Sequence, residues 1–282
     1  MTIGIDIGGT NLRAGLENEG QIIQQNRALL LEKESLDSTL KQLINLVKPL
    51  IKPEVKGLGI GVPSVVDVEK GIVYNVTNIP SWEEVPLKDI LEKEFNLPVY
   101  INNDVNCFTL GEFWFGEAKG YHSIVGMAIG TGLGSGIIIN NQLYIGHNGG
   151  AGEIGLLPYL DKTLEYFASG NFFPTYYINS AHEAFEAALS GDKNALTQWE
   201  RFGHHIGKAV QIVVYTFDPQ VIVIGGSVSK AYQFFKDSMF DTLENFGFPQ
   251  SIKRLKILPS KNENIALLGA AALVHQHLQN IN

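Results

Sequence analysis

The sequence predicts an α/β protein made of two related halves. Near the N-terminus, an apolar run rich in β-branched residues ends at a Gly/Thr turn, and a second apolar run follows it. The same arrangement returns about 120 residues later, at a second Gly/Thr turn. Strand-like and helix-like patterns alternate after each turn, which is typical of α/β layers. Because the two halves follow one plan, we interpret them as a duplicated unit.

The first half opens with a predicted strand pair over 3–7 and 12–16, one strand on each side of the first turn. Apolar residues at helical spacing over 38–50 predict a helix that ends at a proline. The remaining elements expected in this half are a strand over 21–23, a buried strand over 55–62, a loop over 74–86, a helix over 87–95, a strand over 99–101 and a helix over 107–115.

The second half repeats the plan. Its expected elements are strands over 124–130 and 136–140, a mostly irregular segment over 146–180, a long buried helix over 196–217, a strand over 221–224 and a closing helix over about 265–278. Glycine and charged residues over 116–121 favour a domain boundary there. We therefore expect an N-terminal lobe over 1–117 and a C-terminal lobe over 118–264, with the last segment, 265–282, able to pack back on the first lobe.

The composition limits the classes of function. The 282 residues are 45% hydrophobic and 18% charged, the balance of a globular protein. A net charge of −8 argues against a nucleic-acid or anionic-membrane partner. Cys107 is the only cysteine, which excludes a disulfide framework and a thiolate zinc site and is typical of the cytoplasm. The first strand begins at about Ile3, so we expect neither a signal peptide nor an N-terminal DNA-binding domain.

Both Gly/Thr turns have the composition of phosphate-binding turns. Glycine lets the backbone approach a ligand and leaves N–H groups free to face anionic oxygens. Asp6 precedes the first turn, where a carboxylate is suited to hold Mg²⁺ beside phosphates, although a carboxylate that caps the turn explains Asp6 equally well. A third glycine turn, Gly225 and Gly226, is either a plain strand-to-helix turn or a platform for adenosine. The candidate phosphate-binding residues are Gly8, Gly9, Thr10, Asn11, Gly130, Thr131 and Gly132.

Asp104 is the candidate catalytic base. Phosphoryl transfer to an alcohol needs a base near the attacking hydroxyl, and Asp104 follows a buried strand, where open α/β sheets place ligand-binding groups. Asn102 and Asn103 beside it can bind hydroxyl groups. An Asx-turn or a helix cap explains the Asn-Asn-Asp run as well, and the local pattern alone favours that interpretation.

Two glutamates are candidate sugar contacts. Glu153 is a single carboxylate among small residues, and a carboxylate can accept hydrogen bonds from two vicinal hydroxyl groups. Glu165 poses the same choice between a sugar contact and a surface acid. The seven histidines form no recognisable metal set, because the pairs His204/His205 and His275/His277 point apart on a helix.

Taken together, these motifs resemble the ROK family (repressors, open reading frames and sugar kinases) of the actin-like ATPase superfamily, over essentially the whole chain. The two Gly/Thr turns resemble the family's two phosphate motifs. Asn103 and Asp104 match the segment that supplies a sugar-binding Asn and the catalytic Asp. Asn78 and Glu153 match sugar contacts, and the strand that leads to Gly225 and Gly226 matches the adenosine side.

The resemblance implies two ribonuclease-H-like lobes with a central cleft that binds the sugar, ATP and Mg²⁺ as cofactors, and a homodimer. The sequence departs from the family pattern at Leu156, where the family has a His that binds zinc and contacts sugar. The Cys-rich zinc loop is also missing, and the segment around Glu165 resembles only its far end. Ser64 stands where a glycine usually lines the sugar pocket. These departures agree with one another and predict that no zinc is bound.

We therefore expect an ATP- and Mg²⁺-dependent hexose kinase of the glucokinase type that acts at O6. A kinase for N-acetylmannosamine, N-acetylglucosamine or fructose is the alternative within the same class. A sugar-sensing transcriptional regulator and a non-catalytic sugar binder are the alternatives from other classes. The regulator needs a helix-turn-helix and a basic face, and Asp6, Asp104 and Thr131 argue against a degenerate binder.

Overall fold

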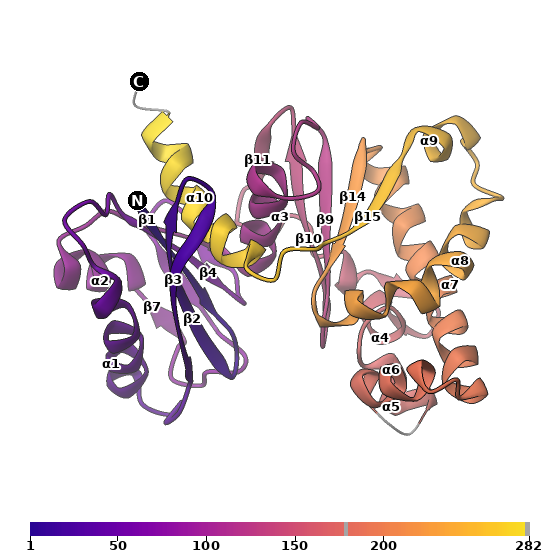
Figure 1. Cartoon of the computed structure of the whole chain (residues 1–282), viewed down its shortest axis with the longest axis horizontal. Helices are drawn as coiled ribbons and strands as arrows, with labels where there is room; N and C mark the ends of the chain where they lie inside the picture. The colour runs from indigo at the N-terminus through magenta and orange to yellow at the C-terminus, as the bar shows by residue number, and fades with distance from the viewer. Residues whose placement is uncertain (178–179, 280–282) are drawn as a thin grey trace. The chain divides into compact units, whose positions relative to one another are not determined.

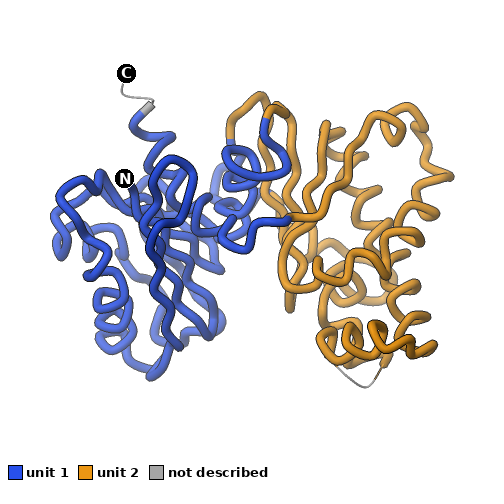
Figure 2. Tube along the Cα trace, viewed as in Figure 1, with its two compact units in different colours: residues 1–119, 143–151, 261–282 blue, residues 120–142, 152–260 orange. Residues whose placement is uncertain are grey.

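The computed structural model describes residues 1–177 and 180–279 (Figure 1). The chain divides into two compact units, which Figure 2 distinguishes by colour. Unit 1 contains residues 1–119, 143–151 and 261–282, and unit 2 contains 120–142 and 152–260. The sequence placed 143–151 in the C-terminal lobe. In the structure this segment belongs to unit 1, and Gly149 lies so close to Val66 that a Cβ on it would be 2.7 Å from the Val66 oxygen.

The core of unit 1 is a five-stranded sheet in the order β3-β2-β1-β4-β8. Strand β1 runs antiparallel to β2 and parallel to β4, which in turn runs parallel to β8. Strands β1 and β4 are buried almost throughout, as expected for strands covered on both faces. The strands are β1 (Thr2–Ile7), β2 (Asn11–Asn18), β3 (Gln21–Leu29), β4 (Leu58–Val62) and β8 (Val99–Asn103).

Unit 1 has a smaller antiparallel sheet and four α-helices among its described residues. The small sheet contains β5 (Val66–Asp67), β6 (Ile72–Tyr74) and β7 (Glu84–Val85), so the predicted 74–86 loop overlaps a strand at each end. The helices are α1 (Leu36–Val47), continued by the short 3-10 helix η1 (Lys48–Leu50), α2 (Leu87–Phe95), α3 (Asp104–Phe115) and α10 (Ile265–Gln279).

Helix α10 packs on α3 and on strands β1 and β4 (Figure 1). Its backbone approaches the sheet at two glycines: a Cβ on Gly4 would lie 1.9 Å from the Leu267 oxygen, and one on Gly59 would lie 1.8 Å from the Ala270 oxygen. The buried carboxylate of Glu17 accepts hydrogen bonds from Thr2 at 2.6 Å and His275 at 3.1 Å. Burial raises the pKa of Glu17, but these hydrogen bonds outweigh it and hold the pKa at about 2.

Unit 2 repeats the strand plan of unit 1, as expected for a duplication. Strand β9 runs antiparallel to β10 and parallel to β14, and β14 runs parallel to β15. This is the pattern of β1, β2, β4 and β8, so the prediction of an α/β fold is confirmed. The strands are β9 (Ile124–Ile129), β10 (Leu133–Ile139), β14 (Val221–Gly225) and β15 (Lys256–Pro259), and β11 (Gln142–Tyr144) follows β10 in the chain.

Helix α7 (Lys193–Phe217) is the long helix of unit 2 and packs along α8 (Tyr232–Leu243). Asp192 caps α7 by accepting a hydrogen bond from the Ala195 N–H at 2.7 Å. The 146–180 segment, of which 178–179 lie outside the described residues, is irregular over just over half of its described length, as predicted, and the rest forms short elements: η2 (Ile154–Leu156), β12 (Pro158–Tyr159), β13 (Lys162–Thr163), α4 (Leu164–Phe167) and α5 (Phe172–Tyr176). The remaining helices are α6 (Ala181–Leu189), η3 (Ser227–Ala231) and α9 (Pro249–Arg254).

Within the described parts of the chain, no helix has the length and apolarity needed to cross a membrane.

Candidate functional site

The first glycine turn lies at the carboxyl end of β1. The Gly8 N–H donates to the Asn11 oxygen at 2.8 Å and closes the turn, so Gly9 and Thr10 form its tip. A Cβ on Gly9 would lie 2.6 Å from the Cβ of Asn78, so only glycine allows this approach. The structure therefore brings the predicted sugar contact Asn78 against the predicted phosphate turn.

Two cations lie beside this turn that sequence reasoning missed. Arg13 donates to Asp6 Oδ2 from Nε at 2.9 Å and from a terminal nitrogen at 2.5 Å. The Lys33 ammonium donates to the Gly9 oxygen. Arg13 had a detectable signal, because the predicted 3–7 and 12–16 hairpin pairs it with Asp6, and the observed register does the same. Lys33 lies outside the sheet, and no pattern in the sequence indicated its contact with Gly9.

Asp104 begins α3, directly after β8. The Asn103 side chain caps the helix by accepting from the Val105 N–H at 2.8 Å, and Asp104 Oδ1 accepts from the same N–H at 2.9 Å. The helix-cap interpretation is therefore right for Asn103. The Asn103 side-chain amide nitrogen donates to the backbone carbonyl oxygen of Ser64 at 3.4 Å, so these two predicted sugar contacts are neighbours.

Asp6 and Asp104 lie at the same edge of the sheet. In the strand register Asp6 pairs with Gly61, and Gly61 pairs with Asn102. Two strand spacings therefore separate the segments that carry the two carboxylates, or about 10 Å. The Cys107 thiol is buried near both carboxylates: burial raises its pKa well above the usual value, and the charges of Asp104 and Asp6 raise it further. This edge of unit 1 can hold a sugar hydroxyl near one carboxylate and phosphates near the other.

The residues around Asp6 fit a Mg²⁺ ion of the kind that binds with a nucleotide. Such an ion takes one or two carboxylates and fills its remaining positions with water and phosphate oxygens. Asp6 supplies one carboxylate beside the glycine turn. Across residues 1–177 and 180–279, no group of three or more His, Cys, Asp and Glu side chains could hold a metal ion alone.

The second glycine turn connects β9 to β10 in unit 2. The Gly130 N–H donates to the Gly132 oxygen at 3.0 Å, and the Ser169 hydroxyl donates to the Thr131 oxygen at 2.8 Å. The Gly170 N–H also donates to the Gly130 oxygen at 2.7 Å. The carbonyls of all three turn residues therefore accept hydrogen bonds, while Thr131 is exposed.

The third glycine turn lies next to the second. Gly225 pairs with Ala128 at the end of the parallel strands β14 and β9. Gly226 has a φ of +83°, which favours glycine. A Cβ on it would lie 2.3 Å from the Ile129 oxygen. Unit 2 therefore gathers the predicted phosphate and adenosine residues at one edge of its sheet.

Glu153 and Glu165 are brought together in unit 2. The Glu165 carboxylate accepts from the Leu133 N–H at 3.4 Å, and a Cβ on Gly132 would lie 2.8 Å from it. The Glu153 side chain is exposed, yet partial burial of its carboxyl group raises the pKa, and the charge of Glu165 raises it further. Two neighbouring carboxylates beside the second glycine turn can accept hydrogen bonds from vicinal hydroxyl groups.

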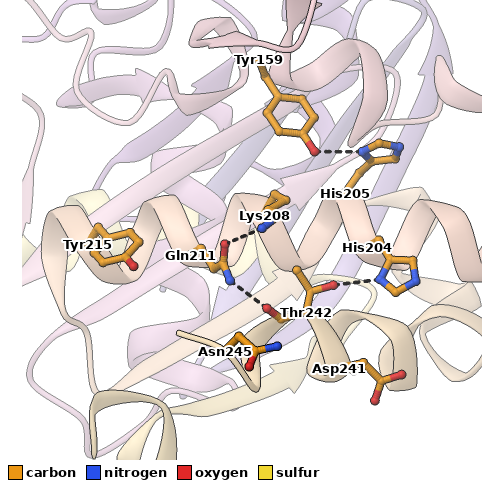
Figure 3. Close-up of a pocket in the computed structure, with 9 residues that line it drawn as sticks. All are labelled: Tyr159, His204, His205, Lys208, Gln211, Tyr215, Asp241, Thr242 and Asn245. Atoms are coloured by element: carbon orange, nitrogen blue, oxygen red, sulfur yellow. Dashed lines mark hydrogen bonds between the residues drawn. The ribbon is translucent and has the colours of Figure 1, made fainter. Parts of the chain in front are cut away.

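The segment that stands where the family carries its zinc loop is a short hairpin, β12 and β13, followed by α4. Leu156 is 58% exposed. Aromatic rings pack behind the hairpin: Tyr159 lies edge-on to Phe167 with ring centres 5.5 Å apart, and Phe167 lies 5.2 Å from the His205 ring. Figure 3 shows a nearby hollow along α7 and α8, lined by Tyr159, His204, His205, Lys208, Gln211, Tyr215, Asp241, Thr242 and Asn245, none of them a predicted site residue.

Comparison with known proteins identifies the family of this chain. The sequence profile of the ROK family matches residues 2–277. The chain is 29% identical to the glucokinase of Thermotoga maritima, and the alignment covers 98% of each protein. It is 30% identical to the xylose repressor of Caldicellulosiruptor bescii, over 96% of this chain and 77% of the repressor. A ROK family glucokinase from Streptomyces griseus, solved with glucose and AMPPNP, superposes with a TM-score of 0.83 at 26% identity and covers 98% of this chain and 99% of that one.

Proposed function

Because the chain belongs to the ROK family over residues 2–277, we propose that it is an ATP-dependent sugar kinase that phosphorylates a hexose at O6, as glucokinases do. The observation that supports this most is the carboxyl edge of the unit 1 sheet, where Asp104 follows Asn103, the Asn103 amide contacts Ser64, and Asp6 lies two strands away in the register. A base, hydroxyl-binding amides and a phosphate turn are the parts that phosphoryl transfer to an alcohol requires. The same resemblance supports a homodimer as the assembly in solution.

In this mechanism Asp104 accepts the proton of the attacking hydroxyl. In unit 1 the candidate sugar contacts are Asn78 and Asn103, with Ser64 beside Asn103. In unit 2 the candidate sugar contacts are Glu153 and Glu165. Asn103 fixes the start of α3 and so the position of Asp104, because its side chain caps that helix. A positioned base of this kind contributes ~10²–10⁴-fold to the rate.

Each glycine turn can offer backbone N–H groups to phosphate oxygens, and in unit 2 Gly225 and Gly226 form the platform for adenosine. Asp6 would hold Mg²⁺, which neutralises phosphate charge when it is bound. Both hydrogen bonds that Arg13 donates to Asp6 end on the same carboxylate oxygen, Oδ2.

The xylose repressor relative supports a second candidate function, a sugar-responsive regulator, because its identity to this chain, 30%, is within one percentage point of the 29% of the Thermotoga maritima glucokinase. The two functions differ in a simple respect. A regulator binds sugar without consuming ATP, whereas a kinase releases ADP only when an acceptor sugar is present.

A coupled ADP-release screen tests the proposal. The acceptors are glucose, mannose, fructose, N-acetylglucosamine and N-acetylmannosamine, each with Mg-ATP and with ATP plus chelator. We expect sugar-dependent ADP release that requires Mg²⁺, with glucose among the best acceptors. Sugar binding in calorimetry without ADP release from any acceptor would favour the regulator instead.

We also predict that the protein binds no structural zinc. A structural site needs four Cys or His ligands, Cys107 is buried in unit 1, and Leu156 stands where the family has its ligating His. Metal analysis of protein purified without chelator should find zinc well below one equivalent, and chelator should leave the melting temperature unchanged. Stoichiometric zinc that resists dialysis would contradict the prediction.

A further inference from the structure

Tyr159 and His205 form a contact in unit 2 that the mechanism above does not use. Tyr159 lies in β12 and His205 in α7, and the phenol oxygen lies 3.1 Å from His205 Nδ1 (Figure 3). Burial raises the pKa of Tyr159, while burial and then the charges of Arg201 and His204 lower that of His205 to about 4. Both groups are therefore uncharged at neutral pH, and the contact is a neutral hydrogen bond.

This contact joins a short segment to a long helix. The segment runs from Pro158 through the β12–β13 hairpin directly into α4, which is a single turn. The hairpin has only two pairs of residues, too few to hold itself in place. Helix α7 has 25 residues and a deeply buried face, so it is a fixed support. Tyr159 is the residue of the hairpin that reaches this support with a hydrogen bond.

We call the Tyr159–His205 contact the anchor. Phe167 of α4 packs against both of its rings. Its ring packs edge-on against Tyr159, with centres 5.5 Å apart, and against His205 at 5.2 Å. Glu165 precedes Phe167 by two positions, and each helical residue turns by about 100°, so the two side chains leave α4 in nearly opposite directions. When Phe167 is held against α7, Glu165 must point the other way, toward the second glycine turn.

The position of the Glu165 carboxylate agrees with this. It accepts from the Leu133 N–H at 3.4 Å and lies where a Cβ on Gly132 would be 2.8 Å away. The negative charge of Glu165 also raises the pKa of Glu153. A rotation of α4 by a fraction of a turn would remove the carboxylate from all three neighbours.

We propose that Tyr159 and His205 are positioning residues: their hydrogen bond fixes the hairpin and α4 on α7 and so sets the direction of the Glu165 carboxylate for sugar binding. The proposal rests on the proposed function, since that gives Glu165 its role as a sugar contact. In this proposal the uncharged Tyr159–His205 pair orders the β12–β13 hairpin and α4.

The first experiment compares Tyr159→Phe with Tyr232→Phe. Each variant removes one phenol oxygen from unit 2, and the Tyr232 hydroxyl bonds the Ile257 oxygen at 3.5 Å, away from α4. With glucose as the probe, Tyr159→Phe should weaken sugar binding and raise the sugar KM about three- to tenfold, the usual worth of one hydrogen bond. The KM for ATP and the kcat at saturation should stay within about twofold. Tyr232→Phe should change none of these values by more than about twofold.

Two substitutions of His205 separate the hydrogen bond from ring packing. His205→Asn keeps a polar group near the position of Nδ1 and loses the ring, whereas His205→Phe keeps a ring and loses the hydrogen bond. Sugar affinity should be closer to wild type in His205→Asn. The reverse order, with His205→Phe closer to wild type, would show that packing alone matters and would overturn the proposal.

Hydrogen exchange tests the anchor without any sugar. Amides over 157–167 should exchange faster in Tyr159→Phe than in wild type, and Tyr232→Phe should leave them unchanged. Unchanged exchange in Tyr159→Phe overturns the anchor. Glu165→Gln distinguishes the sugar contact from the positioning role. If it weakens glucose binding and Tyr159→Phe does not, the positioning role is wrong and the proposed function stands. If Glu165→Gln binds glucose like wild type, the role of Glu165 falls, and this extension falls with it.

Discussion

Asp104→Asn should lower kcat by ~10²–10⁴-fold while leaving the affinities for sugar and ATP within a few-fold of wild type. Asparagine keeps the size of the side chain and can still accept a hydrogen bond from the Val105 N–H, as Asp104 Oδ1 does at 2.9 Å. It cannot accept the proton of the attacking hydroxyl. Steady-state rates measured beside calorimetric binding of each substrate separate the two effects.

Asp89→Asn is the matched control, because Asp89 is also an acidic residue in the first turn of a unit 1 helix, α2. Both substitutions remove a charge from a helix N-terminus and should cost similar stability. Only Asp104→Asn should lose activity. If Asp104→Asn keeps a tenth or more of the wild-type kcat, a barrier change of only ~1.4 kcal/mol, Asp104 is not the base.

Gly59→Ala should destabilise the protein strongly. The added Cβ would lie 1.8 Å from the Ala270 oxygen, so β4 and the backbone of α10 must separate before the side chain fits. Overpacking that shifts the backbone typically costs about 1–3 kcal/mol, and so close an approach to a backbone oxygen places Gly59→Ala at the upper end, about 3 kcal/mol. For a protein of this size that lowers the melting temperature by roughly 6–12 °C.

Gly150→Ala provides the comparison, because a Cβ there meets nothing within 4 Å and its φ is not in the left-handed region. Its melting temperature should match wild type or rise slightly, since alanine restricts the unfolded chain. A melting temperature of Gly59→Ala within 2 °C of wild type, measured by calorimetry, would show that α10 does not pack on β4 as described.

The α/β plan could be predicted from the sequence because both halves carry the same strong local signal. Runs of β-branched residues ending at glycine turns place β1 with β2 and β9 with β10, and the structure has these pairs. Asp104 could be located for a similar reason, since a buried strand delivers it to the sheet edge. The local pattern left two interpretations of Asn103, and the structure shows the capping contact.

The features that sequence reasoning missed depend on contacts between distant segments or on very short elements. Strands of two residues, such as β12 and β13, are too short to show a period. The assignment of 143–151 to unit 1 includes the backbone contact of Gly149 with Val66, which no hydrophobic pattern reports. Lys33 reaches the Gly9 oxygen from a segment outside the sheet.

The most direct test of the proposed kinase activity identifies the product. The protein is incubated with Mg-ATP and each of the five sugars, and the sugar fraction is analysed by mass spectrometry while ADP is counted in the same sample. We predict a hexose monophosphate in a one-to-one ratio with ADP, phosphorylated at O6 when glucose is the acceptor, and absent in Asp104→Asn. ADP without sugar phosphate, or sugar bound but unmodified after prolonged incubation, would contradict the assignment of this chain as a sugar kinase.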